Sequence, residues 1–202
     1  MIRKLIFQVF LGENENLVDH PIFTKSRLCW KIYCDNNGFE YAFFDKDNIN
    51  KYLGEHKEFY YGLEFTWQRI DFIRYLILNQ EGGIYIDMDI FPHVDKNIFE
   101  LLDQPYIFNY WIDPKTGIRE INNALMGVHP GDFDNLIKYS ILETERCRAI
   151  PCYKVRKIRF MLHTTGVRMF KRWIKKNRWS YTPTIHDYVK DTMTCTWVNN
   201  FH

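Results

Sequence analysis

The sequence contains little alanine and no long apolar run. Only three alanines occur in 202 residues, although 46% of the residues are hydrophobic. No stretch approaches the roughly 20 apolar residues that a membrane-spanning helix requires, so no such helix is expected. The opening MIRKLIFQVFLGENEN has a basic pair and a short apolar run but no small-residue cleavage site, and we interpret it as a strand rather than a signal peptide.

The sequence also lacks paired cysteines. The cysteines are odd in number and none forms a C-x-x-C pair, which argues against a disulfide framework or a zinc ribbon. Reduced thiols in a cytoplasmic protein are the simpler interpretation. The five are Cys29, Cys34, Cys147, Cys152 and Cys195.

Acidic residues are absent from the segment between Arg146 and His186, although the net charge of the whole chain is only +2. An acidic partner for this segment is therefore one hypothesis. The segment near 166–178 has the basic amphipathic character of an interfacial helix, which would allow peripheral contact with an anionic membrane. A solvated basic surface is the alternative, and no nucleic-acid partner is expected. The basic residues are Arg146, Arg148, Lys154, Arg156, Lys157, Arg159, Arg168, Lys171, Arg172, Lys175, Lys176 and Arg178.

The first half of the chain alternates strand and helix patterns, which predicts an α/β fold with a mostly parallel sheet. The length favours a single domain over 1–202. Gly82-Gly83 ends the helix predicted over 63–80 directly before a strand. The predicted strands are 4–10, 39–44 and 84–89, and the predicted helices are 21–33 and 63–80, with a short helix after Asp45 and Asp47.

The second half predicts an antiparallel hairpin followed by a helical C-terminal part. The segments 106–112 and 117–128 flank a turn at 113–116. Helices are expected over 132–146, 153–163 and 166–177.

Two carboxylates, Asp87 and Asp89, end the apolar strand IYIDMD. Ligands of open α/β sheets bind outside the carboxyl ends of the strands, where these acids would lie. Residues i and i+2 of an extended segment point to the same side, so the two carboxylates would repel each other unless a cation intervenes. Hard oxygen ligands suit Mg²⁺ or Mn²⁺ together with substrate phosphates. The alternative is a pair of acids on an exposed loop.

The preceding helix carries a second charged pair, Asp71 and Arg74, whose spacing places both on one helix face. The pair could be an ordinary surface ion pair. Because Gly82-Gly83 turns this helix into the acid-tipped strand, however, all four charged groups can gather at one end of the sheet. An Asp–Arg pair can bind sugar hydroxyls, and a metal ion can neutralise the charge of a diphosphate. Together these groups indicate a site for a nucleotide sugar.

The stretch RIDFIRYLILNQEGGIYIDMDIFP resembles the core of the DXD-containing sugar transferases of glycosyltransferase family 32. That family includes fungal mannosyltransferases and is distantly similar to the glucosylating toxins of clostridia. The stretches KLIFQVFLG, FEYAFFDKDNI and INNALMGVHPGD resemble further family segments in the same order, so the similarity is dense over 4–130. It implies a GT-A fold, a nucleotide-sugar donor and a divalent metal, commonly Mn²⁺.

The resemblance also implies roles for individual residues. Asp71 and Arg74 would hold the donor sugar, Asp87 would face the ribose, sugar and metal, and Asp89 would bind the metal that bridges the diphosphate. Asp71, Arg74 and Asp89 are thus the expected catalytic residues. The remaining residues expected at the substrate are Phe10, which either stacks on the base or belongs to the core, Gly83, and Asn122 or Asn123.

The chain departs from the family pattern at several positions. Phe7 replaces the family's histidine in the first strand, and Val167 replaces the proline of a Thr-Gly-Pro turn in HTTGVRMF. The chain stops at His202, which either completes the metal site or is a frayed end. Family members often have a tryptophan shortly after such a histidine, and because none follows here, closure of a lid over the donor is not carried over from the resemblance.

The expected reaction moves a hexose-like unit from a UDP- or GDP-sugar to a hydroxyl of a glycan, lipid-linked or protein acceptor, with retention of configuration. A phosphatase of the haloacid dehalogenase type is the alternative enzyme. It normally has Thr or Val within two residues of its DxD, near the domain start, whereas Asp89 is followed by Ile90-Phe91-Pro92 in mid-chain. A non-enzymatic basic module for anionic lipid or nucleic acid would leave the first half unexplained.

Overall fold

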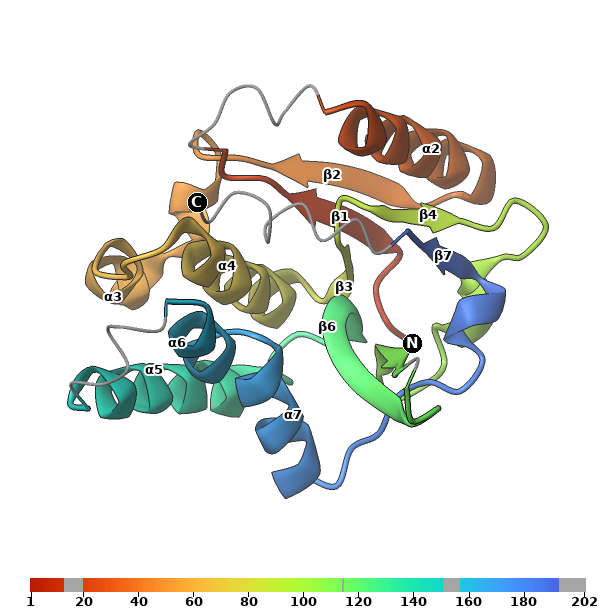
Figure 1. Ribbon diagram of the computed structural model, residues 1–202. Coiled ribbons are helices and arrows are strands. Elements are labelled where there is room, and N and C mark those ends of the chain that lie inside the picture. Colours follow the sequence, from red (N-terminus) through yellow and green to blue (C-terminus); the bar gives the residue numbers. More distant parts are fainter. Residues whose placement is uncertain (13–19, 114, 151–156, 193–202) are drawn as a thin grey trace.

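A computed structural model describes residues 1–12, 20–113, 115–150 and 157–192, with the side chains of 157–159 not described. Its centre is a five-stranded sheet with the strand order β2-β1-β3-β6-β5 (Figure 1). β1 is parallel to β2 and β3, whereas β6 is antiparallel to β3 and β5. Four of the five strands therefore run in one direction, as predicted. The strands are β1 (Leu5–Val9), β2 (Glu40–Phe44), β3 (Gly83–Ile86), β5 (Ile107–Ile112) and β6 (Arg119–Val128).

Helices cover both faces of the sheet. One face packs against α2 (Pro21–Asn37), and the other packs mainly against α4 (Thr66–Glu81), α5 (Asp134–Arg148) and α7 (Val167–Lys176). Two shorter helices, α3 (Lys57–Tyr61) and α6 (Lys157–Thr164), lie beside α4 and α5. Single turns of 3₁₀ helix occupy Ile49–Tyr52, Gly54–His56, Ile98–Leu101 and Ile185–Asp187.

The strand β1 is buried on both of its faces. Phe7 contacts Phe44 and Tyr85 within the core layer beneath α4, and its neighbour Ile6 belongs to the opposite layer, which contains Trp30 of α2. Side chains alternate across a strand, so a continuous apolar run fills two core layers at once. Phe7, which stands in place of the family's histidine, is fully buried and therefore serves packing.

The predicted strand 84–89 is three residues too long. β3 ends at Ile86, and Asp87 to Asp89 form a turn that leads into β4 (Ile90–Pro92). β4 pairs antiparallel with β7 (Val189–Asp191) in a separate two-stranded sheet that the sequence pattern did not predict. The two acids therefore follow the strand instead of ending it.

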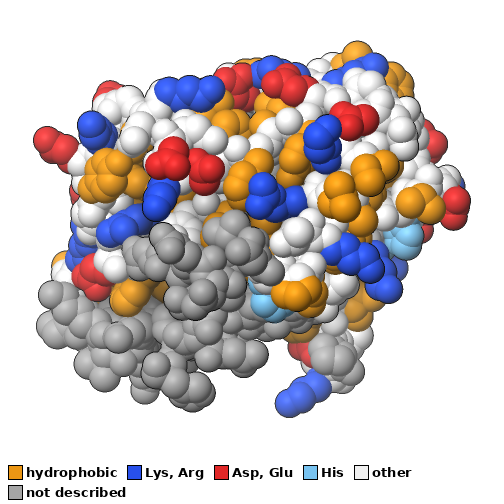
Figure 2. Space-filling model, turned by 90° about the horizontal axis from the view of Figure 1, so that it is seen from above, with side chains coloured by type: hydrophobic (Ala, Val, Ile, Leu, Met, Phe, Trp, Pro, Cys, Tyr) orange, Lys and Arg blue, Asp and Glu red, His pale blue; other side chains and the backbone are white. Residues whose placement is uncertain are grey.

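The surface over α2 has a mixed character. In the view of Figure 2, basic, acidic and hydrophobic side chains are interspersed, without one continuous region of a single charge. Across the described ranges, no helix has both the length and the apolar composition that crossing a bilayer demands.

The junction between α4 and β3 depends on its two glycines. Gly82 and Gly83 have φ values of 66° and 94°, which other residues rarely adopt. A Cβ on Gly83 would lie 2.6 Å from the Leu5 carbonyl oxygen, and one on Gly82 would lie 2.7 Å from Pro130 Cδ. The glycines thus let α4 turn directly into β3 beside β1.

We expect Gly83→Ala to destabilise the protein more than Gly38→Ala does. Gly38 also has a positive φ, of 69°, but a Cβ there would meet nothing within 4 Å. Alanine at Gly38 should cost about 1 kcal/mol for the left-handed conformation alone, whereas at Gly83 overpacking should add about 1–3 kcal/mol. Urea denaturation of both variants measures the difference, and equal losses would show that the contact with Leu5 is relieved without cost.

Candidate active site

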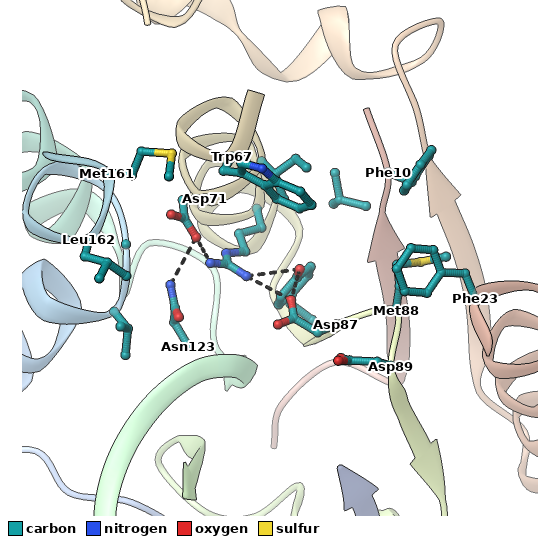
Figure 3. A pocket seen from close by; sticks show the side chains of 16 residues that line it. Phe10, Phe23, Trp67, Asp71, Asp87, Met88, Asp89, Asn123, Met161 and Leu162 are labelled. Atoms are coloured by element: carbon teal, nitrogen blue, oxygen red, sulfur yellow. Dashed lines mark hydrogen bonds and ion pairs between the residues drawn. The ribbon is translucent and has the colours of Figure 1, made fainter. Parts of the chain in front are cut away.

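A cavity of about 190 Å³ opens beside the carboxyl ends of β1 and β3. Its polar residues come from α4, from the turn after β3 and from β6, and they lie between two apolar groups of side chains (Figure 3). The lining residues are Val9, Phe10, Phe23, Trp67, Ile70, Asp71, Arg74, Tyr85, Asp87, Met88, Asp89, Asn123, Met161, Leu162, Gly166 and Val167.

Arg74 links α4 to the turn that carries the two acids. Its guanidinium donates to Asp71 on the same helix, and Nη1 lies 3.0 Å from Asp87 Oδ1 and 3.1 Å from the Tyr85 hydroxyl. The arginine is only 4% exposed. Burial by itself lowers its pKa, but Tyr85 and Asp87 raise the pKa overall, so the guanidinium stays charged. The predicted face shared by Asp71 and Arg74 is confirmed as a buried ion pair.

Asp87 remains short of positive charge despite this contact. Burial raises the pKa of its carboxyl to about 7, with Arg74 opposing the rise and Asp89 adding to it. Tyr85 also donates to the same oxygen, Oδ1. The side chain is still 34% exposed toward the cavity. A carboxylate in this position favours an additional cation, because a nearby positive charge stabilises its ionised form.

The backbone of the acid-bearing turn is held by side chains from β1 and α2. Gln8 Nε2 donates to the Asp87 carbonyl at 3.2 Å, while Ser26 Oγ and Trp30 Nε1 both donate to the Ile90 carbonyl, at 2.7 and 2.8 Å. Gln8, Ser26 and Trp30 are all fully buried. Buried polar groups with their partners in place are costly to disrupt, so this turn is fixed at both ends.

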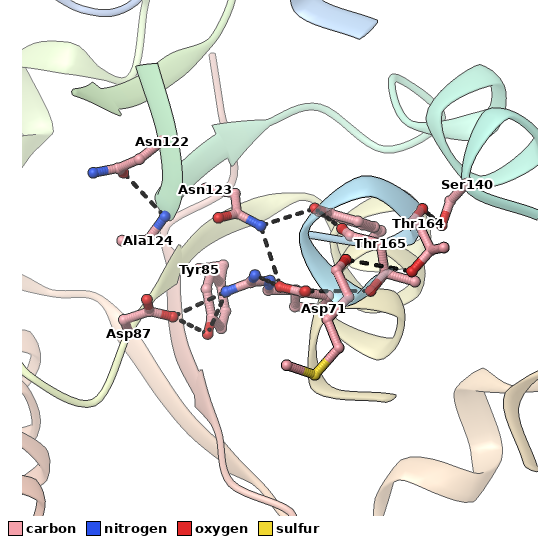
Figure 4. Close-up of polar contacts among 12 residues, drawn as sticks. Asp71, Tyr85, Asp87, Asn122, Asn123, Ala124, Ser140, Thr164 and Thr165 are labelled. Carbon is pink, nitrogen blue, oxygen red and sulfur yellow. Dashed lines mark hydrogen bonds and ion pairs between the residues drawn. The ribbon is translucent and has the colours of Figure 1, made fainter. Parts of the chain in front are cut away.

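Asp71 contacts two further residues that lie far along the chain. Asn123 Nδ2 donates to Asp71 Oδ1 at 3.2 Å, and Thr165 Oγ1 donates to Oδ2 at 3.3 Å (Figure 4). Asn123 lies on β6, and Thr165 lies in the turn between α6 and α7. Asp71 is therefore the point at which three separate parts of the fold meet.

The structure brings most of the predicted site residues to this cavity. Of the two asparagines, Asn123 lines it, whereas Asn122 points the other way and accepts from the Ala124 amide at 3.1 Å. His202 lies outside the described residues. The residues that do line the cavity are Phe10, Asp71, Arg74, Asp87, Asp89 and Asn123.

The prediction for Gly83 is corrected. Gly83 starts β3, at the end of the strand away from the acids, and it is not among the lining residues. Its lack of a side chain serves the close approach to Leu5 rather than a substrate.

The apolar side chains on both sides of the cavity include residues that the sequence did not predict to lie there. Phe10 packs with Phe23 and Met88 at one end, with 6.1 Å between the two ring centroids. Trp67 and Met161 line the cavity elsewhere, on either side of Asp71 in Figure 3. The position of Trp67 one helical turn before Asp71 was a usable signal, whereas nothing local marked Phe23.

The acids fit a hard divalent cation that also binds the substrate. Asp87 and Asp89 offer carboxylate oxygens, which Mg²⁺ and Mn²⁺ prefer. Within the described ranges, no third acidic, histidine or cysteine side chain lies close enough to Asp87 and Asp89 to complete a metal site made of protein ligands alone. Such cations commonly take one or two carboxylates and complete their shell with water and phosphate oxygens, which agrees with this pair.

We expect Arg74→Lys to destabilise the fold by about 1.5–3 kcal/mol, because a lysine ammonium cannot replace the fork that joins two carboxylates and Tyr85. Arg3→Lys is the control, since Arg3 pairs with Glu40 and Glu81 at a side-chain exposure of 42%. The control should lose at most about 1 kcal/mol. Urea denaturation of both variants measures this, and equal losses would contradict the assigned importance of Arg74.

Two family profiles match the chain. The glycosyltransferase sugar-binding region containing the DXD motif matches residues 25–108, and the TcdA/TcdB catalytic glycosyltransferase domain matches residues 70–148. Both matched ranges contain Asp71, Arg74, Asp87 and Asp89. These matches agree with the expected resemblance to sugar transferases and clostridial toxins, while assignment to glycosyltransferase family 32 itself stays a prediction.

One curated relative and one solved structure extend the comparison. The uncharacterized glycosyltransferase L373 of Acanthamoeba polyphaga mimivirus is 30% identical over 149 residues, which cover 70% of this chain and 57% of the relative. The chain thus spans little more than half of that relative's length. The PaToxG glycosyltransferase superimposes with a TM-score of 0.52 at 15% identity, covering 87% of this chain and 70% of that one. The chain therefore resembles DXD-containing glycosyltransferases in sequence and has the predicted GT-A fold.

Proposed function

We propose that the protein is a glycosyltransferase that moves a hexose-like sugar from a UDP- or GDP-sugar to a hydroxyl acceptor with the help of Mn²⁺ or Mg²⁺. The observation that carries the proposal is the meeting of the Asp71–Arg74 pair with Asp87 and Asp89 at one cavity. The sequence resemblance to sugar transferases supports this reaction over the phosphatase alternative.

The cavity suggests how a donor would lie. The diphosphate would approach Asp87 and Asp89, where a bound cation would neutralise the charge that develops on the leaving group. The nucleoside would extend toward Phe10 and Phe23, whose rings can pack against a base. The sugar would then lie beside Asp71 and Asn123.

Arg74 would act mainly by orienting other groups. It is 4% exposed, and its two terminal nitrogens already serve Asp71, Asp87 and Tyr85, while its buried Nε has no hydrogen-bond partner among the described residues. We therefore assign Arg74 the role of fixing the carboxylates of Asp71 and Asp87 relative to each other, with at most a minor direct contact to the donor. Accurate placement of reacting groups is itself a large part of catalysis.

The remaining parts of the proposal come from the family resemblance. Retention of anomeric configuration is one of them, and we assign no covalent nucleophile. The acceptor would be a glycan, a lipid-linked molecule or a protein.

Peripheral contact with an anionic membrane also stays a prediction. Part of the positive charge of the basic segment is balanced locally, because Lys171 pairs with Glu120, and Arg172 and Arg146 pair with Glu143. Lys175, Lys176 and Arg178 are exposed and could attract anionic lipid.

A donor screen tests the function. Purified protein with Mn²⁺ should hydrolyse or transfer from one member of a panel of UDP- and GDP-sugars, and Asp89→Ala should lower the rate about 100-fold or more, because an electrostatic contact to the leaving group is lost. Asp95→Ala is the control, since Asp95 is exposed and does not line the cavity. Removal of Mn²⁺ with EDTA should have the same effect as Asp89→Ala.

Three outcomes are informative. Metal-dependent turnover that is lost with Asp89→Ala and kept with Asp95→Ala would support the proposal. Binding of a donor without turnover would indicate that an acceptor is required. A folded protein that binds no donor in the panel would overturn the proposed function.

A further inference from the structure

Four residues around the proposed sugar end of the cavity form a closed ring of hydrogen bonds, in which Thr165 takes part through both its side chain and its backbone carbonyl. Asn123 Nδ2 donates to Asp71 Oδ1 at 3.2 Å and to the Tyr75 hydroxyl at 3.0 Å. The Tyr75 hydroxyl donates to the Thr165 carbonyl at 2.8 Å, and Thr165 Oγ1 donates back to Asp71 Oδ2 at 3.3 Å. The ring joins α4, β6 and the α6–α7 turn, as the contacts in Figure 4 show.

The direction of each hydrogen bond in the ring is fixed by chemistry. Burial raises the pKa of Tyr75, so its hydroxyl keeps its single proton at neutral pH and gives it to the Thr165 carbonyl. Toward Asn123 the Tyr75 oxygen can then only accept. Asp71, paired with Arg74, is a carboxylate and also accepts only. The Asn123 amide must therefore turn its NH₂ group, and not its carbonyl, toward both of them.

This orientation leaves the carbonyl oxygen of Asn123 for the cavity. Among the described residues no donor contacts that oxygen, and Asn123 lines the cavity. Asp71 also lines the cavity and retains lone pairs beyond those that its three protein partners use. The wall next to the proposed sugar position thus presents hydrogen-bond acceptors.

The α6–α7 turn lies close enough to control Asp71 directly. A Cβ placed on Gly166 would lie 3.2 Å from Asp71 Oδ2 and 3.0 Å from Leu162 Cα, which is tighter than ordinary side-chain contact. Thr165 itself is fully buried. Thr165 therefore places its hydroxyl donor against Asp71, and the glycine that follows it allows this close approach. A larger residue in place of Gly166 would push the turn away from Asp71.

We propose that Tyr75 and Thr165 are positioning residues that hold Asp71 and Asn123 with acceptor oxygens toward the cavity, so that the site recognises a neutral sugar through hydrogens of its hydroxyl groups. The inference rests on the proposed function. Neither Tyr75 nor Thr165 touches the sugar in this arrangement, since each acts through Asp71 or Asn123.

Thr165→Val tests the proposal, because valine has nearly the shape of threonine but cannot donate to Asp71. The probes are the UDP- or GDP-sugar that the screen identifies and the matching nucleoside diphosphate without a sugar, each titrated with Mn²⁺ by calorimetry. We expect the affinity for the nucleotide sugar to fall about tenfold, as for a lost hydrogen bond to a charged group. The affinity for UDP or GDP alone should stay within about twofold, because the ring does not face the diphosphate.

Three further variants separate positioning from a general loss of structure. Thr165→Ser keeps the hydroxyl and should restore most of the affinity. Tyr75→Phe breaks the ring at another point and should reproduce the selective loss, which keeps the test available if Thr165→Val does not fold. Thr144→Val is the matched control, because Thr144 is a fully buried threonine that donates to the Ser140 carbonyl on α5 and does not line the cavity.

Fluorinated donors test the polarity of the wall. Fluorine in place of a hydroxyl can accept weakly but cannot donate, so one of the monodeoxyfluoro forms of the donor sugar should bind wild type about tenfold more weakly than the parent donor. The same fluorine-for-hydroxyl change in the donor should weaken binding to the Thr165→Val variant by a smaller factor than it weakens binding to wild type.

The outcomes distinguish this proposal from the proposed function. If wild type turns over a donor but Thr165→Val and Tyr75→Phe bind it normally, or weaken UDP or GDP equally, the positioning role is wrong and the proposed function stands. If every fluorinated donor binds wild type as well as the parent does, the acceptor wall is wrong. If wild type binds no nucleotide sugar at all, the proposed function fails and this inference fails with it.

Discussion

A buried guanidinium organises the end of the sheet at which the candidate site lies. Arg74 is 4% exposed, and an isolated charge at such a position would be very costly. Its position is tolerable because Asp71 from its own helix and Asp87 from the turn after β3 both compensate it. The same contacts fix the helix relative to the turn, because a buried ion pair that loses one partner leaves an uncompensated charge. The carboxylates of Asp71 and Asp87 are thus held in one geometry by the Arg74 guanidinium that lies between them.

The turn with the two acids is restrained from two directions. Arg74 and Tyr85 hold the Asp87 side chain, while Gln8, Ser26 and Trp30 hold the backbone carbonyls of Asp87 and Ile90. The amide and the hydroxyl of Thr192 both donate to the Asp89 carbonyl, at 3.2 and 2.7 Å, which ties the turn to the strand pair β4–β7. Polar groups that are fixed before a ligand arrives need no reorganisation when charge develops, and this is the main way in which such sites lower a barrier.

Local patterns in the sequence predicted the parts of this site that are local in the chain. The i, i+3 spacing placed Asp71 beside Arg74, and the Gly-Gly junction brought that pair to the acids after β3. The three-residue strands β4 and β7 were missed because segments so short carry no readable period. Thr165 lies 94 residues from Asp71 and Gln8 lies 79 residues from Asp87, so no spacing could reveal these contacts. The choice between Asn122 and Asn123 depended on which face of β6 meets α4. The pairing of β5 with β6 is irregular here, since the partner steps from Met126 opposite Phe108 to Ile121 opposite Tyr110, and a simple alternation along the strand therefore could not decide it.

The small number of acids has a consequence for how metal and donor would bind. The described residues bring Asp87 and Asp89 to the cavity but no third protein ligand, and Asp87 already shares its charge with Arg74. A cation on this pair would keep several coordination positions for water or phosphate oxygens. A diphosphate would in turn meet two carboxylates, which repel it unless the cation intervenes. Each ligand therefore removes an obstacle to the other, and such a coupling is reciprocal by thermodynamic necessity. On the proposed function, the described carboxylates provide part of a metal site to which the phosphates of the substrate would contribute.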